Sequence, residues 1–246
     1  MKLSYTAVWD DTAALLRANG SLVAALAGVF FFLPALLVAY FLPQPQAATV
    51  QQMVPLFEQY FSANWYWILL NGLLGMAGTL AVMLLVFAPR GTTVAGAIAA
   101  AAALLPFYFA AALLSNLIIA VGLMLLIVPG IYLFGRLTPL AAVVAAENRR
   151  NPVDAITRCL AVTRGNGWAI VGMVILVAIA GAITVGVINT LLGLVLLLVL
   201  GKGLAPLLTM IVGAALGAAL QALLVILFAA LYRALVPGTA SAAAAN

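Results

Sequence analysis

The sequence predicts an all-α polytopic membrane protein with about six transmembrane helices. The 246 residues are 67% hydrophobic and only 6% charged, against about 25% charged in an ordinary soluble domain. Two stretches, residues 91–135 and 165–201, contain no charged side chain. At about 1.5 Å of rise per residue, a helix over the first stretch far exceeds the ~30 Å hydrocarbon core of a bilayer. That stretch must therefore cross more than once.

Six apolar runs supply the crossings of a single membrane domain over residues 1–236. They cover about residues 20–42, 64–88, 106–128, 131–147, 168–188 and 205–235. Pro129 and Gly130 are expected to turn the chain between the third and fourth runs, because Pro lacks an amide donor and Gly tolerates positive φ. The fourth run is short and can kink at Pro139. Residues 237–246 have no apolar face and are expected to be disordered.

Amphipathic helices on the membrane surface are expected beside these spans. In "NPVDAITRCLAVTRGNGW", Asn151 is a good N-cap and Pro152 suits the first helical position. Val153, Ile156 and Leu160 then recur on one helical face. The basic residues of this interfacial helix and its flanks are Arg149, Arg150, Arg158 and Arg164. Long cationic side chains can reach anionic headgroups while their stems cover apolar surface.

The N-terminus resembles this segment, which predicts an internal hairpin repeat. Aligning "SYTAVWDDTAALLRANGSLVA" on "NPVDAITRCLAVTRGNGWAIV" matches Arg17 with Arg164 and places the cap candidate Ser4 on Asn151. A third, fainter copy is expected to begin at "RGTTVAGAIAAAAALLP", with Thr92 or Thr93 as cap. Residues 50–67 are expected to form an outer interfacial helix that leads to an aromatic belt. Hairpin repeats are common in transporters, and they also enlarge other helical membrane proteins.

The distribution of basic residues predicts the orientation. With six spans and a cytoplasmic N-terminus, one side receives Lys2, Arg17, Arg90, Arg149, Arg150, Arg158, Arg164 and Arg233. The opposite side receives only Lys202, and Arg136 falls inside a span. Cytoplasmic loops carry the excess of Lys and Arg, so both termini are expected in the cytoplasm of a bacterial inner-membrane protein. A cleavable signal peptide is the alternative for the N-terminus, but the first apolar run is too long and begins late.

Forty residues in the middle of the chain carry a family resemblance. The run from "PGIYLFGRLTPLAAVVAAE" through "NPVDAITRCLAVTRGNGW" resembles the membrane domain fused to some glycerophosphodiester phosphodiesterases and its stand-alone YciC-type relatives. The matching positions are Pro129, Gly130, Tyr132, Arg136, Glu147, Pro152, Ala155, Arg158, Thr163, Arg164, Gly165 and Trp168. The resemblance implies a six-helix bacterial inner-membrane protein. It implies no hydrolase activity, because no hydrolase domain is attached.

Arg136 is the leading candidate for a ligand contact. An ionisable residue inside a span is expensive to bury, so a functional role is the first hypothesis. Lying about 9 Å beyond the expected turn at Gly130, it is predicted to reach a phosphate or carboxylate near the outer headgroups. The structural alternative is that Arg136 extends outward to headgroups, or caps backbone carbonyls freed at Pro139.

Other polar side chains within the spans are candidates for ligand or lipid contact. Asn71, Asn116 and Gln221 could line a polar path, although such amides more often join helices. Glu147 is a candidate carboxylate, with a local ion pair to Arg149 or Arg150 as the structural alternative. Small residues recur along the sixth span at Thr209, Gly213, Gly217 and Gln221, and in the second at Gly75, Gly78 and Thr79, which is typical of close helix packing.

The sequence contains few of the residue types that catalysis or cofactor binding requires. There is no His and only one Cys, Cys159, so metal binding, cofactor chemistry and nucleophilic catalysis with a His base are not expected. The net charge of +5 is explained by orientation rather than by nucleic acid. The predicted partners are anionic lipid headgroups. The function hypotheses are a transporter or lipid-handling permease for an anionic or amphipathic molecule, and a scaffold or partner protein in envelope maintenance.

Overall fold

The structure, a computed structural model, describes residues 3–42, 49–87 and 92–236, and it is helical without strands over these ranges. Five segments are long and apolar enough to cross a membrane, namely Tyr5–Phe41, Met53–Phe87, Val94–Leu125, Ile127–Glu147 and Gly167–Leu235. The predicted class, an all-α polytopic membrane protein, is confirmed. The last segment folds back on itself, so it supplies two apolar arms. The predicted disordered tail lies outside the described residues.

The first segment is one bent helix. Ser4 caps α1 (Tyr5–Ala27), because its side chain accepts a hydrogen bond from the amide of Ala7. A π turn (η1, Gly28–Phe32) then leads into α2 (Leu33–Phe41). The π turn directly precedes Pro34, whose ring lacks an amide donor and crowds the carbonyl four residues earlier. The predicted surface helix before residue 20 is therefore continuous with the first span rather than separate.

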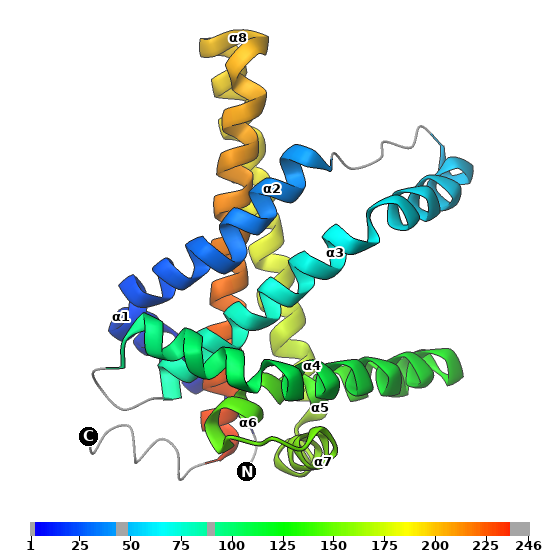
Figure 1. Cartoon of the computed structure of the whole chain (residues 1–246), viewed down its shortest axis with the longest axis vertical. Coiled ribbons are helices and arrows are strands. Elements are labelled where there is room, and N and C mark those ends of the chain that lie inside the picture. Colours follow the sequence, from blue (N-terminus) through cyan, green and yellow to red (C-terminus); the bar gives the residue numbers. More distant parts are fainter. Residues whose placement is uncertain (1–2, 43–48, 88–91, 237–246) are drawn as a thin grey trace.

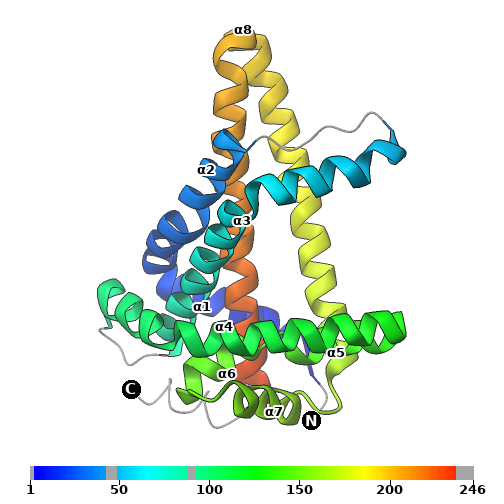
Figure 2. The same ribbon diagram turned by 45° about the vertical axis from the view of Figure 1, so that its right-hand side comes forward.

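The next two helices are also longer than their predicted spans. Helix α3 (Val50–Phe87) is continuous through Pro55 and includes the predicted outer interfacial segment. Helix α4 (Val94–Leu125) begins at Thr93, which accepts a hydrogen bond from Gly96, as one of the two predicted caps. Figures 1 and 2 show α4 lying across the long axis of the molecule, near the end at which α1 begins and α7 lies.

The predicted turn at Pro129 and Gly130 is wrong. The break lies at Leu126, which has extended geometry (φ −157°, ψ 134°), and α5 (Ile127–Leu137) already contains both residues. Gly130 serves close packing instead: a Cβ there would lie 2.6 Å from the amide nitrogen of Leu123 on α4. The predicted kink at Pro139 is present, because the helix stops at Leu137 and resumes as α6 (Leu140–Glu147).

Of the helices predicted to lie on the membrane surface, α7 (Pro152–Val162) is separate from the spans in the structure. Asn151 accepts hydrogen bonds from the amides of Val153 and Asp154, as its cap pattern predicts. The buried face differs from the predicted one: Ala155, Ile156 and Cys159 are buried, whereas Val153 is exposed. The helix packs against α4, α5 and α6 and is therefore part of the protein core.

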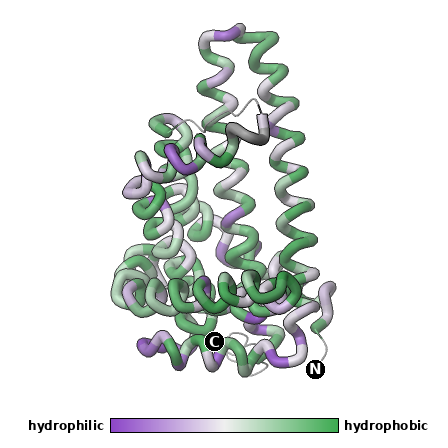
Figure 3. The backbone as a smooth tube through the Cα atoms, turned by 90° about the vertical axis from the view of Figure 1, so that its right-hand side faces the viewer, coloured by the Kyte–Doolittle hydropathy of each residue, from purple (hydrophilic) through white to green (hydrophobic). Residues whose placement is uncertain are grey.

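A long hairpin completes the fold. Helix α8 (Gly167–Leu235) is continuous except at Gly201, where φ of 68° reverses the chain. Its arms pack through small residues: Cβ atoms built at Gly193 and Gly213 would lie 3.1 Å from Thr209 and Asn189, respectively. Residues 189–200, which fall between the fifth and sixth predicted spans, are helical because they are apolar and contain no proline. Figure 3 shows mostly hydrophobic arms between the turn and the opposite end.

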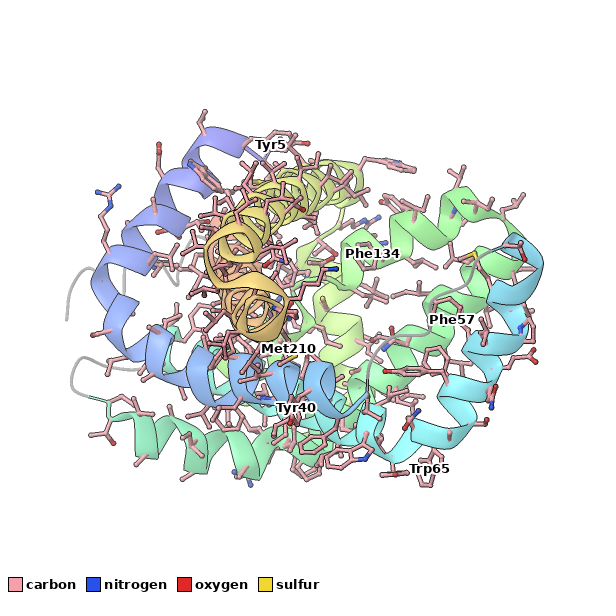
Figure 4. The ribbon with its side chains drawn as sticks, turned by 90° about the horizontal axis from the view of Figure 1, so that it is seen from above. Tyr5, Tyr40, Phe57, Trp65, Phe134 and Met210 are labelled. Atoms are coloured by element: carbon pink, nitrogen blue, oxygen red, sulfur yellow. The ribbon has the colours of Figure 1, made fainter. Side chains whose placement is uncertain are left out.

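The core lies at the end of the molecule opposite the hairpin turn, which we call the base. Fully buried side chains there come from α3, α6 and the last turns of α8, among them Met83, Val144 and Tyr232. The start of α1, the end of α8 and α7 lie at this end (Figures 1 and 2). Above the base the helices diverge, and Figure 4 shows the hairpin with Met210 well apart from Phe57 and Trp65 on α3.

Candidate functional site

Glu147 is the centre of a polar cluster at the base. Its carboxylate accepts hydrogen bonds from Nε of Arg149 (2.7 Å), Nε of Arg158 (2.8 Å) and the hydroxyl of Tyr232 (2.8 Å). Only 18% of the Glu147 side chain is exposed, and Tyr232 is fully buried. These contacts join the end of α6, α7 and the last turn of α8. The predicted ion pair to Arg149 is confirmed, and Arg158 and Tyr232 complete the set of donors.

Local backbone geometry presents Glu147 to its partners. Helix α6 ends at Asn148, which adopts left-handed geometry (φ 48°, ψ 44°), a conformation that Asn tolerates better than most residues. The chain then reverses into α7, and Arg149 also pairs with Asp154 in its first turn. The hydrogen bonds that Arg149 donates to Glu147 and Asp154 raise its pKa above its ordinary value. Two carboxylates and two guanidinium groups thus neutralise one another, which leaves no free charge in the cluster for a substrate.

Arg136 is placed differently from the sequence prediction. Its guanidinium donates to the carbonyl of Leu160 in the last turn of α7 and lies 5.7 Å from the ring centre of Tyr132. The amide of Arg164 bonds to Ala161 instead, so the Leu160 carbonyl lacks its usual helical donor. Arg136 therefore caps α7. It lies beside the basic helix, not on the opposite side near outer headgroups, and it does not cap the carbonyls freed at Pro139.

The freed carbonyls at the end of α5 are capped by α7 in return. The thiol of Cys159 donates to the carbonyl of Arg136 (3.3 Å), and the hydroxyl of Thr163 lies between this carbonyl (3.1 Å) and that of Cys159 (2.7 Å), either of which can accept its proton. Helix α5 stops two residues before Pro139, which leaves its last carbonyls without intrahelical donors. Burial raises the pKa of Cys159 to about 12, so its sulfur stays a protonated donor. The two helix ends thus cap each other.

Substitution of Arg136 is expected to lower stability rather than ligand binding. Arg136→Gln leaves the Leu160 carbonyl with a weaker donor and removes a favourable charge at the end of α7, a loss of about 1–2 kcal/mol. The stability of Arg136→Lys is expected to lie between those of the unmodified protein and Arg136→Gln, because Lys keeps the positive charge but lacks the planar guanidinium group. Thermal unfolding in detergent measures the series. Lipid retained per folded molecule should stay constant, and a drop in lipid at unchanged stability would instead support the ligand hypothesis.

The three span amides are not brought together by any contact among the described residues. Asn71 on α3 is partly buried, whereas Asn116 on α4 and Gln221 on α8 are exposed. None of the three has a side-chain hydrogen bond to another described residue, and so they form no joint polar site. Along the small-residue stripes, Gly213 packs on Asn189 as described, but a Cβ at Gly217 would meet nothing within 4 Å. Helix packing therefore explains only part of these stripes.

The base also contains functional contacts that the sequence reasoning missed. Arg233 lies 3.5 Å from Asp11 on α1 and so pairs with it. Tyr232, the adjacent residue, reaches Glu147 on α6. Neighbouring residues in the last turn of α8 thus bind two different helices. The available signal was a Tyr-Arg pair at the very end of an apolar span, where polar side chains rarely lack a partner.

Three arginines at or near the base remain available for contact with a ligand or lipid. Arg17 on α1, Arg150 before α7 and Arg164 after it are exposed, and no ion pair joins them to another described residue. Two tryptophans are also exposed, namely Trp9 (46%) on α1, the helix of Arg17, and Trp168 (54%) at the start of α8, just after Arg164. Trp168 packs on Tyr132 at 5.7 Å between ring centres. Of the predicted interfacial basic set, Arg150 and Arg164 are free, whereas Arg149 and Arg158 are bound to Glu147.

Comparison with known proteins provides no relative for this arrangement: no family model, no curated protein and no solved structure matches the chain.

Proposed function

We propose that the chain is a non-enzymatic scaffold protein of the bacterial inner membrane that binds anionic lipid at its base. The main observation in favour is the division of its charges. The ionisable residues expected to meet a substrate, Arg136 and Glu147, are engaged in joining helices. Arg17, Arg150 and Arg164 are exposed and have no ion pair with another described residue, and exposed tryptophans lie on α1 and at the start of α8. Trp and basic side chains together favour the headgroup layer of an anionic membrane.

The orientation in this proposal follows from the excess of basic residues. Among the described residues, the base contains Arg149, Arg150, Arg158 and Arg164 on or beside α7, with Arg136 against it and Arg233 nearby. The hairpin turn contains Lys202. The positive-inside rule therefore supports a cytoplasmic base and cytoplasmic termini. The YciC-type resemblance remains part of the proposal, supported by the roles of its matching residues in the joint between α5, α6, α7 and α8.

A lipid-handling permease is the second candidate, and one observation favours it. Asn116 and Gln221 expose amide groups on apolar helices without a partner among the described residues. An unpartnered amide in hydrocarbon is unfavourable, and a polar headgroup in transit would bond to it. If this is correct, Asn116→Leu and Gln221→Leu will abolish lipid movement between leaflets of a reconstituted vesicle. The scaffold proposal expects no such movement in the unmodified protein.

Removing the three unpaired arginines is expected to release anionic lipid. Each Lys or Arg near an anionic surface contributes about 1 kcal/mol, so Arg17→Gln, Arg150→Gln and Arg164→Gln together should weaken retention by about 3 kcal/mol, or roughly a hundredfold. Native mass spectrometry of the detergent-solubilised protein, incubated with phosphatidylglycerol, measures the bound lipid. Thermal stability should change little, because none of these side chains has an ion pair with another described residue.

The matched control is the pair of bound arginines. Arg149→Gln with Arg158→Gln removes two positive charges from the same end, but these side chains are bound to Glu147. This variant should lose stability while it retains most of its lipid per folded molecule. Lipid loss in proportion to the number of charges removed in both variants would show that net charge alone attracts lipid, and unchanged binding in the triple variant would contradict the proposal.

A further inference from the structure

The half of the α8 hairpin nearest its turn has an unusually exposed apolar surface. Its end at the turn projects beyond the other helices in Figures 1 and 2. Large side chains on both arms are exposed, with Leu198 at 86% and Val199 at 75%. The others are Leu191, Leu192, Leu194, Val195, Leu197, Leu200, Leu204 and Leu207. Surface of this kind is not stable in water, so another apolar medium must cover it.

The length of the hairpin identifies that medium. The helix spans 69 residues with its reversal at Gly201, so each arm has 34 residues and is about 51 Å long at 1.5 Å per residue. Residues 168–200 contain no charge. A tilt of 40°, the upper end of the usual range, reduces their ~50 Å to about 38 Å. An ordinary hydrocarbon core is only ~30 Å thick.

Charged residues and Trp168 mark the ends of this long apolar layer, and no charged side chain lies between them. Arg164, Trp168 and Arg233 lie at the base, and Lys202 lies at the turn. Asn189, about 32 Å from Trp168 along the arm, could mark the level of an interface. It does not, because its side chain faces Gly213 on the other arm while Val187, Ile188, Leu191 and Leu192 beside it are exposed. The exposed apolar surface thus continues past it to the turn.

We propose that the α8 hairpin is a surface for the acyl chains of a thick bilayer, so that the protein prefers, and locally thickens, membranes of long-chain lipid. This partner is independent of the headgroup-binding arginines at the base. Hydrophobic mismatch costs a modest free energy per ångström, and over several ångströms this amounts to a preference of about tenfold.

The test is a chain-length series with the full protein. The chain is reconstituted into phosphatidylcholine vesicles with acyl chains of fourteen, eighteen or twenty-two carbons, a neutral headgroup that leaves the basic residues without anionic partners. The thermal unfolding midpoint should rise with chain length. In mixed vesicles, partitioning should favour the longest lipid by about tenfold over the shortest. A midpoint that does not depend on chain length, or one that is highest in the shortest lipid, overturns the proposal.

A shortened hairpin provides the matched control. Deleting residues 191–197 and 205–211 removes two turns from each arm, about 10 Å, while the reversal at Gly201 and the contact of Asn189 with Gly213 are kept. The acyl chain length that gives the highest thermal unfolding midpoint should be shorter for this variant than for the full chain. If this variant does not fold, the dependence of the full chain's unfolding midpoint on lipid length still tests the proposal. A second copy covering the hairpin is the competing explanation: it predicts a dimer in every lipid and no dependence on chain length, which would overturn the proposal.

Discussion

Replacing Glu147 with alanine is expected to lower the free energy of unfolding by about 3 kcal/mol. The substitution removes the common acceptor of Arg149, Arg158 and Tyr232 and leaves a buried hydroxyl unpaired. We take the lower end of the range for a buried ion pair, because 38% of the Arg158 side chain is exposed and water screens it. Thermal unfolding in detergent should show a midpoint about 6–12 °C lower.

The partners of Glu147 provide a graded comparison. Tyr232→Phe removes one hydrogen bond to a charged acceptor and should cost about 1.5 kcal/mol. Asp154→Asn removes only an exposed pairing with Arg149, so its effect should stay below about 0.5 kcal/mol. The double variant of Glu147 and Tyr232 should be less destabilised than the sum of the single variants, because both remove the same contact. Full additivity, or a neutral Glu147→Ala, would mean that the cluster does not hold the helices together.

Gly135→Ala is expected to separate α5 from α8. A Cβ at Gly135 would lie 2.3 Å from Cγ2 of Val171 and 2.7 Å from the backbone oxygen of Gly167. The valine can rotate, but the backbone oxygen cannot move without shifting the helix. The cost should be about 3 kcal/mol, at the upper end for overpacking. The thermal unfolding midpoint measures this loss of stability. The contact of Tyr132 with Trp168 should also be lost, which a change in tryptophan fluorescence would report.

Two further variants separate this clash from a general effect of glycine. Gly135→Ala combined with Val171→Ala should recover only part of the stability, because the contact with the Gly167 oxygen remains. Gly217→Ala, on α8, meets nothing within 4 Å and should be neutral or slightly stabilising, since Ala favours helix over Gly. If Gly135→Ala behaves like Gly217→Ala, the close crossing of α5 and α8 is not required for the fold.

The sequence determined the features that depend on neighbouring residues. Ser4, Thr93 and Asn151 were correctly predicted as helix caps, because a cap forms with amides only two or three residues away. The kink at Pro139 follows from a missing amide donor. The membrane class follows from summed hydropathy, which no tertiary contact can change. The boundaries of spans were less certain, since apolar helices continue until something stops them, as α8 does past residue 188.

The tertiary structure alone decided which polar side chains are free. Arg136 and Glu147 stood out in the sequence because they are charges in or beside an apolar span, but a sequence does not show that Leu160 lacks a donor or that Tyr232 reaches α6. Those partners lie 24 and 85 residues away. Among the basic residues around α7, the fold likewise engages Arg149 and Arg158 and leaves Arg150 and Arg164 exposed. Charge and hydropathy are properties of single residues, whereas pairing and exposure depend on which distant helices meet.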